Sequence, residues 1–115
     1  MSRPGPHPER FTLTYDPSIA EDLAALDPDE RHAARAILDD LARGAVTGKE
    51  LGGRHVSGDL TGYARVKFDV PGRHPQLLRL VYRQLGPDAR RVFAIGRRDD
   101  HAVYLLAVDR LGRRS

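Results

Sequence analysis

The residues from Tyr63 to Val70 alternate between two kinds of side chain, and this alternation constrains the fold more than any other feature. One set of positions holds Tyr63, Arg65, Lys67 and Asp69, and the other holds Ala64, Val66, Phe68 and Val70. A period of two is the signature of a strand that packs one face and wets the other. The sequence therefore predicts a strand whose solvent face carries cations.

Further strands are predicted at 11–15, 77–84 and 91–96, where apolar and β-branched side chains recur between turn residues. The connections 71–76 and 86–88 contain glycine and proline, as turns do, and the first is longer than a tight hairpin needs. Residues 45–62 hold five glycines and are predicted to form a long loop. The predicted core comprises Ile37, Leu38, Leu41, Phe68, Leu78, Leu80, Phe93 and Ile95.

Two helices are predicted ahead of this loop. Asp16 is expected to cap the first helix, with Pro17 at its first position. Asp27 is expected to cap the second, with Glu30 completing a capping box and Gly44 ending the helix. A last short helix is expected after Asp99 or Asp100. The order is β-α-α-β-β-β-α, which predicts an α+β domain with a mostly antiparallel sheet and its helices on one face.

Length and composition limit the class of protein. A chain of 115 residues forms one domain with a modest core, expected here at 11–112 behind a flexible, proline-rich tail at 1–10. The chain has no cysteine, no apolar run near the ~20 residues that span a bilayer, and no signal-peptide pattern at its start. A cytoplasmic protein is therefore expected, with no membrane partner.

Charge is distributed unevenly along the chain. Residues 1–60 hold 7 Lys and Arg against 11 Asp and Glu, whereas residues 61–115 hold 12 against 5. Basic residues gathered in one half form an electrostatic footprint for a polyanion, although a solvated arginine-rich surface would give the same count. Arginine suits phosphate because its planar fork can bind two oxygens at once.

The cations of the second half are predicted to converge on one patch. Arg65 and Lys67 share one face of a strand, Arg79 and Arg83 share one face of the next, and Arg97 and Arg98 end the third. Tyr104 falls where the chain turns back. Exposed sheet faces are often charged without any such function, so spacing alone leaves both interpretations open.

Three motifs in order resemble the RelE/ParE toxin superfamily. They are Ser57-Gly-Asp-Leu-Thr-Gly-Tyr63-Ala-Arg-Val-Lys67, then Leu78-Arg-Leu-Val-Tyr82, and then Ala94-Ile-Gly96-Arg-Arg-Asp99 followed by Val103-Tyr104. The resemblance spans residues 11–111 in the order of elements and is motif-specific from 57 to 104. It implies a RelE-like fold, with an N-terminal helical hairpin packed on the sheet and a short C-terminal helix.

The resemblance also implies a site and an activity. The RelE-like branch cleaves messenger RNA in the ribosomal A site, and its functional positions fall on Arg65, Lys67, Arg79, Arg98 and Tyr104. Arg65 stands where the branch has a lysine, and an arginine can hold phosphate but is a poor base. Lys67 is therefore the expected base, activated by neighbouring cations that lower its pKa. Arg79 and Arg98 are expected to stabilise the charge of a phosphorane.

The remaining expectations concern supporting groups and alternatives. Arg65, Arg83 and Arg97 are expected to bind substrate, and Tyr104 to stack on or orient a base. His101 is a candidate for an additional acid or base, but a surface histidine in a helix cap accounts for it more simply. No histidines have metal-ligand spacing, so no metal or other cofactor is expected. The implied partners are an antitoxin, the bacterial ribosome and messenger RNA. Two alternatives stay open: a non-catalytic gyrase inhibitor of the same superfamily, and a nucleic-acid-binding protein without toxicity.

Overall fold

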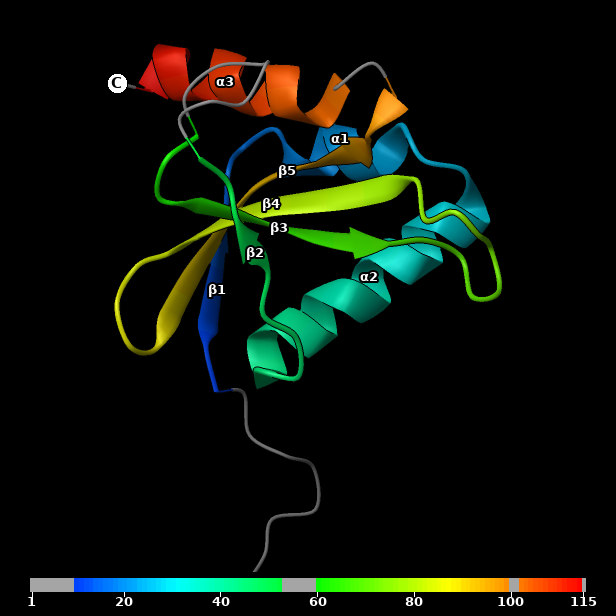
Figure 1. The fold of residues 1–115 in the computed structure, drawn as a ribbon, viewed down its shortest axis with the longest axis horizontal. Coiled ribbons are helices and arrows are strands. Elements are labelled where there is room, and N and C mark those ends of the chain that lie inside the picture. The colour runs from blue at the N-terminus through cyan, green and yellow to red at the C-terminus, as the bar shows by residue number, and fades with distance from the viewer. Residues whose placement is uncertain (1–9, 53–59, 100–101, 115) are drawn as a thin grey trace, which may run out of the picture.

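The computed structural model of the chain describes residues 10–52, 60–99 and 102–114, and it shows an α+β fold (Figure 1). The expected tail therefore lies outside the described residues, apart from Arg10. In chain order the elements are β1 (Thr12–Tyr15), α1 (Ile19–Ala24), α2 (Pro28–Arg43), β2 (Lys49–Glu50), β3 (Tyr63–Phe68), β4 (Leu78–Gln84), β5 (Ala89–Arg97) and α3 (Ala102–Arg114).

The five strands form one mixed sheet in the order β1-β5-β4-β3-β2. Strands β2 to β5 pair antiparallel with their neighbours, and β1 pairs parallel with β5. The prediction of a mostly antiparallel sheet is confirmed. Lys67 pairs with Arg79, which in turn pairs with Gly96, so the three central strands bring positions distant in sequence into one row.

The short strand β2 lies inside the segment that was predicted to be a loop. Lys49 pairs with Arg65, and the Gly48 N–H donates to the Tyr82 hydroxyl at 2.9 Å. A Cβ added to Gly48 would lie 2.6 Å from the Arg65 carbonyl oxygen, so a side chain at this position would push β2 away from β3. The glycine that favoured a loop prediction is thus the residue that lets β2 pair.

Helices cover both faces of the sheet, which corrects the prediction that they lie on one. The side chains of α1 and α2 pack with Val66, Leu80 and Ile95 of the sheet, in one cluster of buried residues. The α3 residues Val103 and Ala107 belong to a second cluster, with Val81, Phe93 and Ala94. Figure 1 shows α2 and α3 on opposite sides of the sheet. Strand β5 contributes Val92 and Ile95 to the first cluster and Phe93 and Ala94 to the second, so its run is continuously hydrophobic.

The second helix begins and ends as predicted, whereas the first does not. Asp27 and Glu30 form a complete capping box, and Gly44 ends α2 in the left-handed conformation with φ of 74°. Helix α1 is instead preceded by Ser18, whose side chain makes no capping hydrogen bond. The buried Asp16 carboxylate accepts the Ser18 N–H at 3.0 Å, so it closes a turn before the helix.

Helix α3 is longer than the short helix predicted, and a buried ion pair fastens it to α1. Arg110 donates to the two Asp22 carboxylate oxygens at 2.5 and 2.7 Å and to the Phe93 carbonyl oxygen at 2.9 Å. Asp22 also accepts the Ile95 N–H at 3.0 Å. The hydrogen bonds that Asp22 accepts from Arg110, together with the negative charge of Asp22, raise the pKa of Arg110 against the opposing effect of burial. Asp22 and Arg110 thus satisfy the Ile95 N–H and the Phe93 carbonyl oxygen, two backbone groups of β5 that lie beyond the end of β1.

Candidate nucleic-acid interface

Five cationic side chains gather on the face of the sheet that α3 also covers, and we call them the cationic cluster: Lys49, Arg65, Lys67, Arg79 and Arg98. Strand β3 supplies two of them, β2 and β4 supply one each, and Arg98 directly follows β5. Because side chains two residues apart share a face, Arg65 and Lys67 point the same way, beside the partners that the strand pairing gives them.

The crowding of positive charge changes the acidity of Lys67. Its side chain is exposed, and its pKa is lowered from the ordinary value of 10.5. Arg65 contributes most to this shift and Arg79 next, followed by partial desolvation, Lys49 and Arg98. The cations disfavour a further positive charge, so the neutral amine is more accessible than in an isolated lysine.

Arg79 is the buried member of the cluster, 5 % exposed. Its guanidinium donates to the carbonyl oxygens of Gln76 and Leu78, both at 2.9 Å, and also hydrogen-bonds with Tyr104. Burial lowers the pKa of Arg79, Tyr104 opposes that effect, and Arg65 and Arg98 add to it. The Tyr104 ring lies within the buried cluster beneath α3 and is 5 % exposed, so it faces Arg79 more than it faces solvent.

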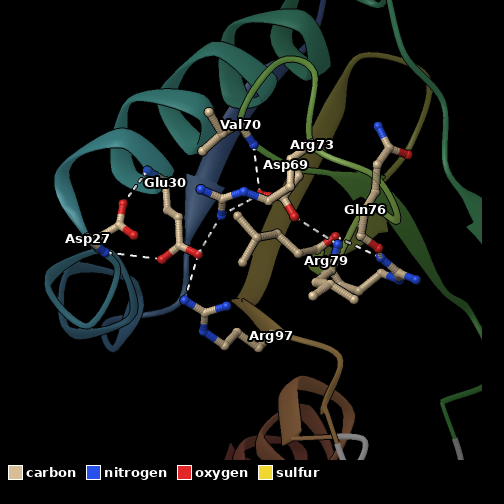
Figure 2. A network of polar contacts seen from close by, with 10 residues as sticks. Asp27, Glu30, Asp69, Val70, Arg73, Gln76, Arg79 and Arg97 are labelled. Atoms are coloured by element: carbon tan, nitrogen blue, oxygen red, sulfur yellow. Dashed lines mark hydrogen bonds and ion pairs between the residues drawn. The ribbon is translucent and has the colours of Figure 1, made fainter.

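Asp69 holds the backbone that positions two arginines of the cationic cluster, Arg79 and Arg98, and Figure 2 shows Asp69 with the first of them. The alternation in β3 predicted an exposed Asp69, but its side chain is only 1 % exposed. It accepts the Leu77 N–H at 2.9 Å and the Val70 N–H at 2.8 Å. The Leu77 carbonyl oxygen in turn accepts the Arg98 N–H at 2.9 Å. One carboxylate thus fixes the end of the 71–76 connection, and with it the groups that carry Arg98 and bind Arg79.

Strand β3 ends at Phe68, and its alternation fails one residue later because Asp69 turns into this polar network. Burial alone would raise the pKa of Asp69, but the two backbone N–H donors, Arg73 and Arg97 together lower it. Its carboxylate is therefore held in the charged form.

The structure does not bring Arg97 into the cationic cluster. Its side chain lies on the α2 side of the sheet and pairs with the buried Glu30 carboxylate at 2.6 Å, as Figure 2 shows. Arg73 pairs with the same carboxylate at 3.3 Å and with Asp69 at 3.1 Å. Neighbouring positions in one strand point to opposite faces, so Arg97 and Arg98 separate as soon as β5 forms.

The other predicted site residues lie elsewhere. Arg83 is exposed at the far end of the same sheet face, opposite Tyr63. His101 lies outside the described residues. Across residues 10–52, 60–99 and 102–114, no three His, Asp or Glu side chains are grouped as metal ligands would be. Within those ranges no helix is long and apolar enough to cross a membrane.

Lys49 is the member of the cluster that sequence reasoning missed. It lies in a strand of two residues that has no measurable period, inside a glycine-rich segment. Its neighbour Glu50 further hides it, because an isolated Lys-Glu pair is typical of solvated loops. A signal was nevertheless present, because Lys49 is one of only two lysines in a chain that otherwise uses arginine.

The five-stranded sheet between α2 and α3 has the fold of the RelE toxins. A solved structure of a mutant of the E. coli toxin RelE, in its free state, is similar to this chain with a TM-score of 0.60. The similarity covers 89% of this chain and 97% of that one, at 20% sequence identity. No protein-family model and no curated protein sequence matches the chain. The similarity of the two structures confirms the expected fold. At this sequence identity it is evidence about the fold alone.

Proposed function

We propose that the chain is the toxin of a type II toxin–antitoxin system and cleaves messenger RNA in the ribosomal A site. The observation that carries the proposal is the convergence of Lys67, Arg79 and Arg98 on one face, with the pKa of Lys67 lowered by its neighbours. A site of several cations and one accessible amine suits phosphodiester chemistry, in which negative charge builds on the phosphate. The likeness to a toxin fold supports the same conclusion.

The proposed reaction requires no metal ion. The RNA 2′-hydroxyl attacks the adjacent phosphorus, and neutral Lys67 takes its proton. The new 2′-oxygen–phosphorus bond forms as the bond to the 5′-oxygen breaks, which leaves a 2′,3′-cyclic phosphate. The leaving 5′-oxygen takes up a proton from water, and His101 is a further candidate for that acid. Arg79 and Arg98 stabilise the charge that develops on the phosphorane, and hydrogen bonds to the Gln76 and Leu78 carbonyl oxygens hold Arg79 in place before the substrate arrives.

Tyr104 is assigned a positioning role in this mechanism. Because its ring is buried and it hydrogen-bonds with Arg79, it supports the guanidinium and has little surface for stacking on a base. Arg65 and Lys49 are assigned to holding flanking phosphates. An antitoxin with an acidic segment is the proposed partner in the cytoplasm, because such a segment would cover the cationic cluster and block RNA.

The test is primer extension on messenger RNA bound to bacterial ribosomes, with protein made by cell-free synthesis because a toxin would arrest its host. We expect new cuts confined to the A site. Lys67→Ala and Arg98→Ala should abolish them without unfolding the protein, because both side chains are exposed. Arg43→Ala is the matched control, since it removes an exposed arginine from the end of α2.

Three outcomes would count against the proposal, one against the role of Lys67 and two against the nuclease activity. Cuts that persist in Lys67→Ala would remove Lys67 from the mechanism. If the wild-type protein makes no cuts but still stops growth on expression, its target is gyrase or another macromolecule. If it does neither, the chain is a RelE-fold protein without a toxin's activity.

A further inference from the structure

A second cation-lined site lies at the other end of the same sheet face. The strand pairing places Tyr63 opposite Arg83 and Arg83 opposite Arg91, which forms one row across β3, β4 and β5. Beside this row is a cavity of about 450 Å³, which we call the Tyr63 cavity. Its walls include Tyr63, Arg83, Leu85, Arg91, Phe93 and Leu111. Its volume falls within the range of 300–1,000 Å³ that is typical of small-molecule sites.

The Tyr63 cavity combines an aromatic surface with positive charge. The Tyr63 and Phe93 ring centroids are 5.1 Å apart, and the Arg83 guanidinium carbon lies 5.8 Å from the Tyr63 centroid. Phe93 is buried and Tyr63 is half-buried, so Tyr63 offers the accessible ring. Leu85 adds apolar surface, with 47% of its area exposed.

The two arginines of the cavity lack carboxylate partners among the residues that the structure describes. Arg73, Arg97 and Arg110, by contrast, are each paired with a buried acid. Two unpaired cations beside an aromatic ring are typical of sites that bind single-stranded nucleic acid, where phosphates meet arginine and bases stack on rings. An acidic peptide segment would satisfy the charge but offers no planar face to the Tyr63 ring.

The cavity and the cationic cluster are joined along β3. Tyr63, Arg65 and Lys67 occupy alternate positions, so all three point to the same face. A rise of 3.3 Å per residue places Tyr63 about 13 Å from Lys67, which a short RNA strand can span. Arg65, half-buried between them, belongs to the cationic cluster and lies beside Lys49.

We infer that the Tyr63 cavity binds a nucleotide of the RNA whose scissile phosphate occupies the cationic cluster. Its base lies against Tyr63 and the apolar wall, and its phosphate pairs with Arg83 and Arg91. The inference rests on the proposed function for its choice of ligand. It adds a subsite away from the reacting atoms, where changes affect the binding of RNA and not the chemical step.

The first experiment measures binding without cleavage. A short fluorescent RNA with 2′-O-methyl groups lacks the attacking hydroxyl, so its affinity can be followed by anisotropy. We expect Arg83→Gln and Arg91→Gln each to weaken binding about tenfold, as for the loss of a charge-assisted contact. Arg43→Gln is the matched control and should bind as the wild type does. Equal affinity in all four proteins would overturn the inference.

A second comparison tests for the base. A strand of the same length with abasic sites keeps every phosphate but has nothing to stack on Tyr63. Wild-type protein should bind the strand with bases more tightly, and Tyr63→Leu should remove most of that preference while keeping the apolar packing. No preference in the wild type would overturn the stacking. Tighter binding of oligoglutamate than of RNA, lost in Arg83→Gln, would instead assign the cavity to a protein partner.

The ribosome assay separates this inference from the proposed function. If Arg83→Gln raises the protein concentration needed for half-maximal cleavage and leaves the maximal rate unchanged, both stand. Cleavage that is identical in Arg83→Gln and wild type leaves the function standing and removes the subsite. RNA binding that depends on Arg83 and on bases, without any cleavage on ribosomes, keeps the cavity as an RNA site and removes the nuclease.

Discussion

At the scale of single residues, Lys67 is set apart by its charged neighbours more than by desolvation. A lowered pKa means that the fold holds its protonated form less readily than the unfolded chain does. That destabilisation is present below the folded pKa and is relieved as the pH rises through it toward 10.5. The effect works in favour of a base, because the neutral form becomes available at lower pH.

Titration of the lysines by NMR tests this directly. The chain has two lysines, so ¹³C-lysine labelling gives two side-chain signals, which Lys49→Gln assigns. We expect Lys67 to titrate below 10.5, and Arg65→Gln to move that pKa upward because Arg65 is the largest cause of the shift. Arg43→Gln should leave it unchanged. A Lys67 that titrates at the ordinary value in the wild type would contradict the electrostatic account.

Asp69 carries a second prediction about pH, in the acid range, and here too stability rises with pH. Its lowered pKa contributes stability that is present above the unfolded pKa and is lost as the pH falls through the folded one. Asp69→Ala should cost about 2–4 kcal/mol at neutral pH, because two backbone donors and Arg73 lose a buried acceptor. Urea unfolding from pH 7 into the acid range measures both effects.

Asp69→Asn serves as the partial rescue. Its side-chain oxygen can still accept the Leu77 N–H, so the loss should be smaller than in Asp69→Ala, but the charge and its acid dependence disappear. The Arg98 amide resonance provides a local reading of the same network, since its N–H binds the Leu77 carbonyl oxygen. An unmoved Arg98 amide in Asp69→Ala would show that Asp69 does not position this arginine.

At the scale of elements, α3 depends on one buried ion pair. Arg110 is 6 % exposed and binds Asp22 through two hydrogen bonds. Arg110→Ala should destabilise the fold by about 3–5 kcal/mol, because it leaves the Asp22 carboxylate buried without its partner. Chemical denaturation measures the loss.

The same helix supplies the control. Arg113 pairs with Asp109 across an exposed turn of α3, where 71% and 54% of the two side chains are accessible. Removal of such a pair costs at most about 1 kcal/mol, so Arg113→Ala should change stability little. Equal losses in Arg110→Ala and Arg113→Ala would mean that the buried pair is not what holds α3.

Features that a local pattern determines were predictable from the sequence. The capping box of Asp27 and Glu30, the left-handed Gly44 and the alternation of β3 each depend on residues a few positions apart, and the structure has all three. The face that a helix covers depends instead on contacts distant in sequence. No local pattern could place α3 on the face opposite α2, or pair Lys49 with Arg65.

The candidate site divides in the same way. Lys67 and Arg79 lie in one row because β3 pairs with β4. That pairing was predictable, because the two strands follow one another in the sequence with a turn between them. Arg97 and Arg98 were grouped together, although β-strand geometry sends them to opposite faces. Asp69 was assigned to the solvent face because the alternation of β3 was extended one residue beyond the end of the strand. The hydrogen bonds that bury it come from the 71–76 connection, whose path no pattern specifies.

At the scale of the whole molecule, the cationic cluster predicts a salt dependence. Each phosphate contact with single-stranded nucleic acid adds a slope of about −0.7 to the plot of log affinity against log salt. If the five cations of the cluster each engage one phosphate of the RNA, the slope should be about −3.5. Lys67→Gln should reduce its magnitude by about 0.7, and Arg43→Gln should not change it. A slope near zero, measured by anisotropy across salt concentrations, would exclude phosphate recognition by this face.

The parallel pairing of β1 with β5 has a consequence for how the protein is made. Thr12 pairs with Ala89, so β1 has no partner strand in the described sheet until residue 89 has been synthesised. Arg98 and Tyr104 emerge later still, and Arg110 fastens α3 last. Contacts this distant in sequence form slowly, because the chain loses the entropy of closing a long loop before the contacts can stabilise the fold. A nascent chain therefore carries Lys67 and Arg79 without the groups that complete their surroundings. Vectorial synthesis itself delays the assembled cationic face until the residues of α3 have been synthesised.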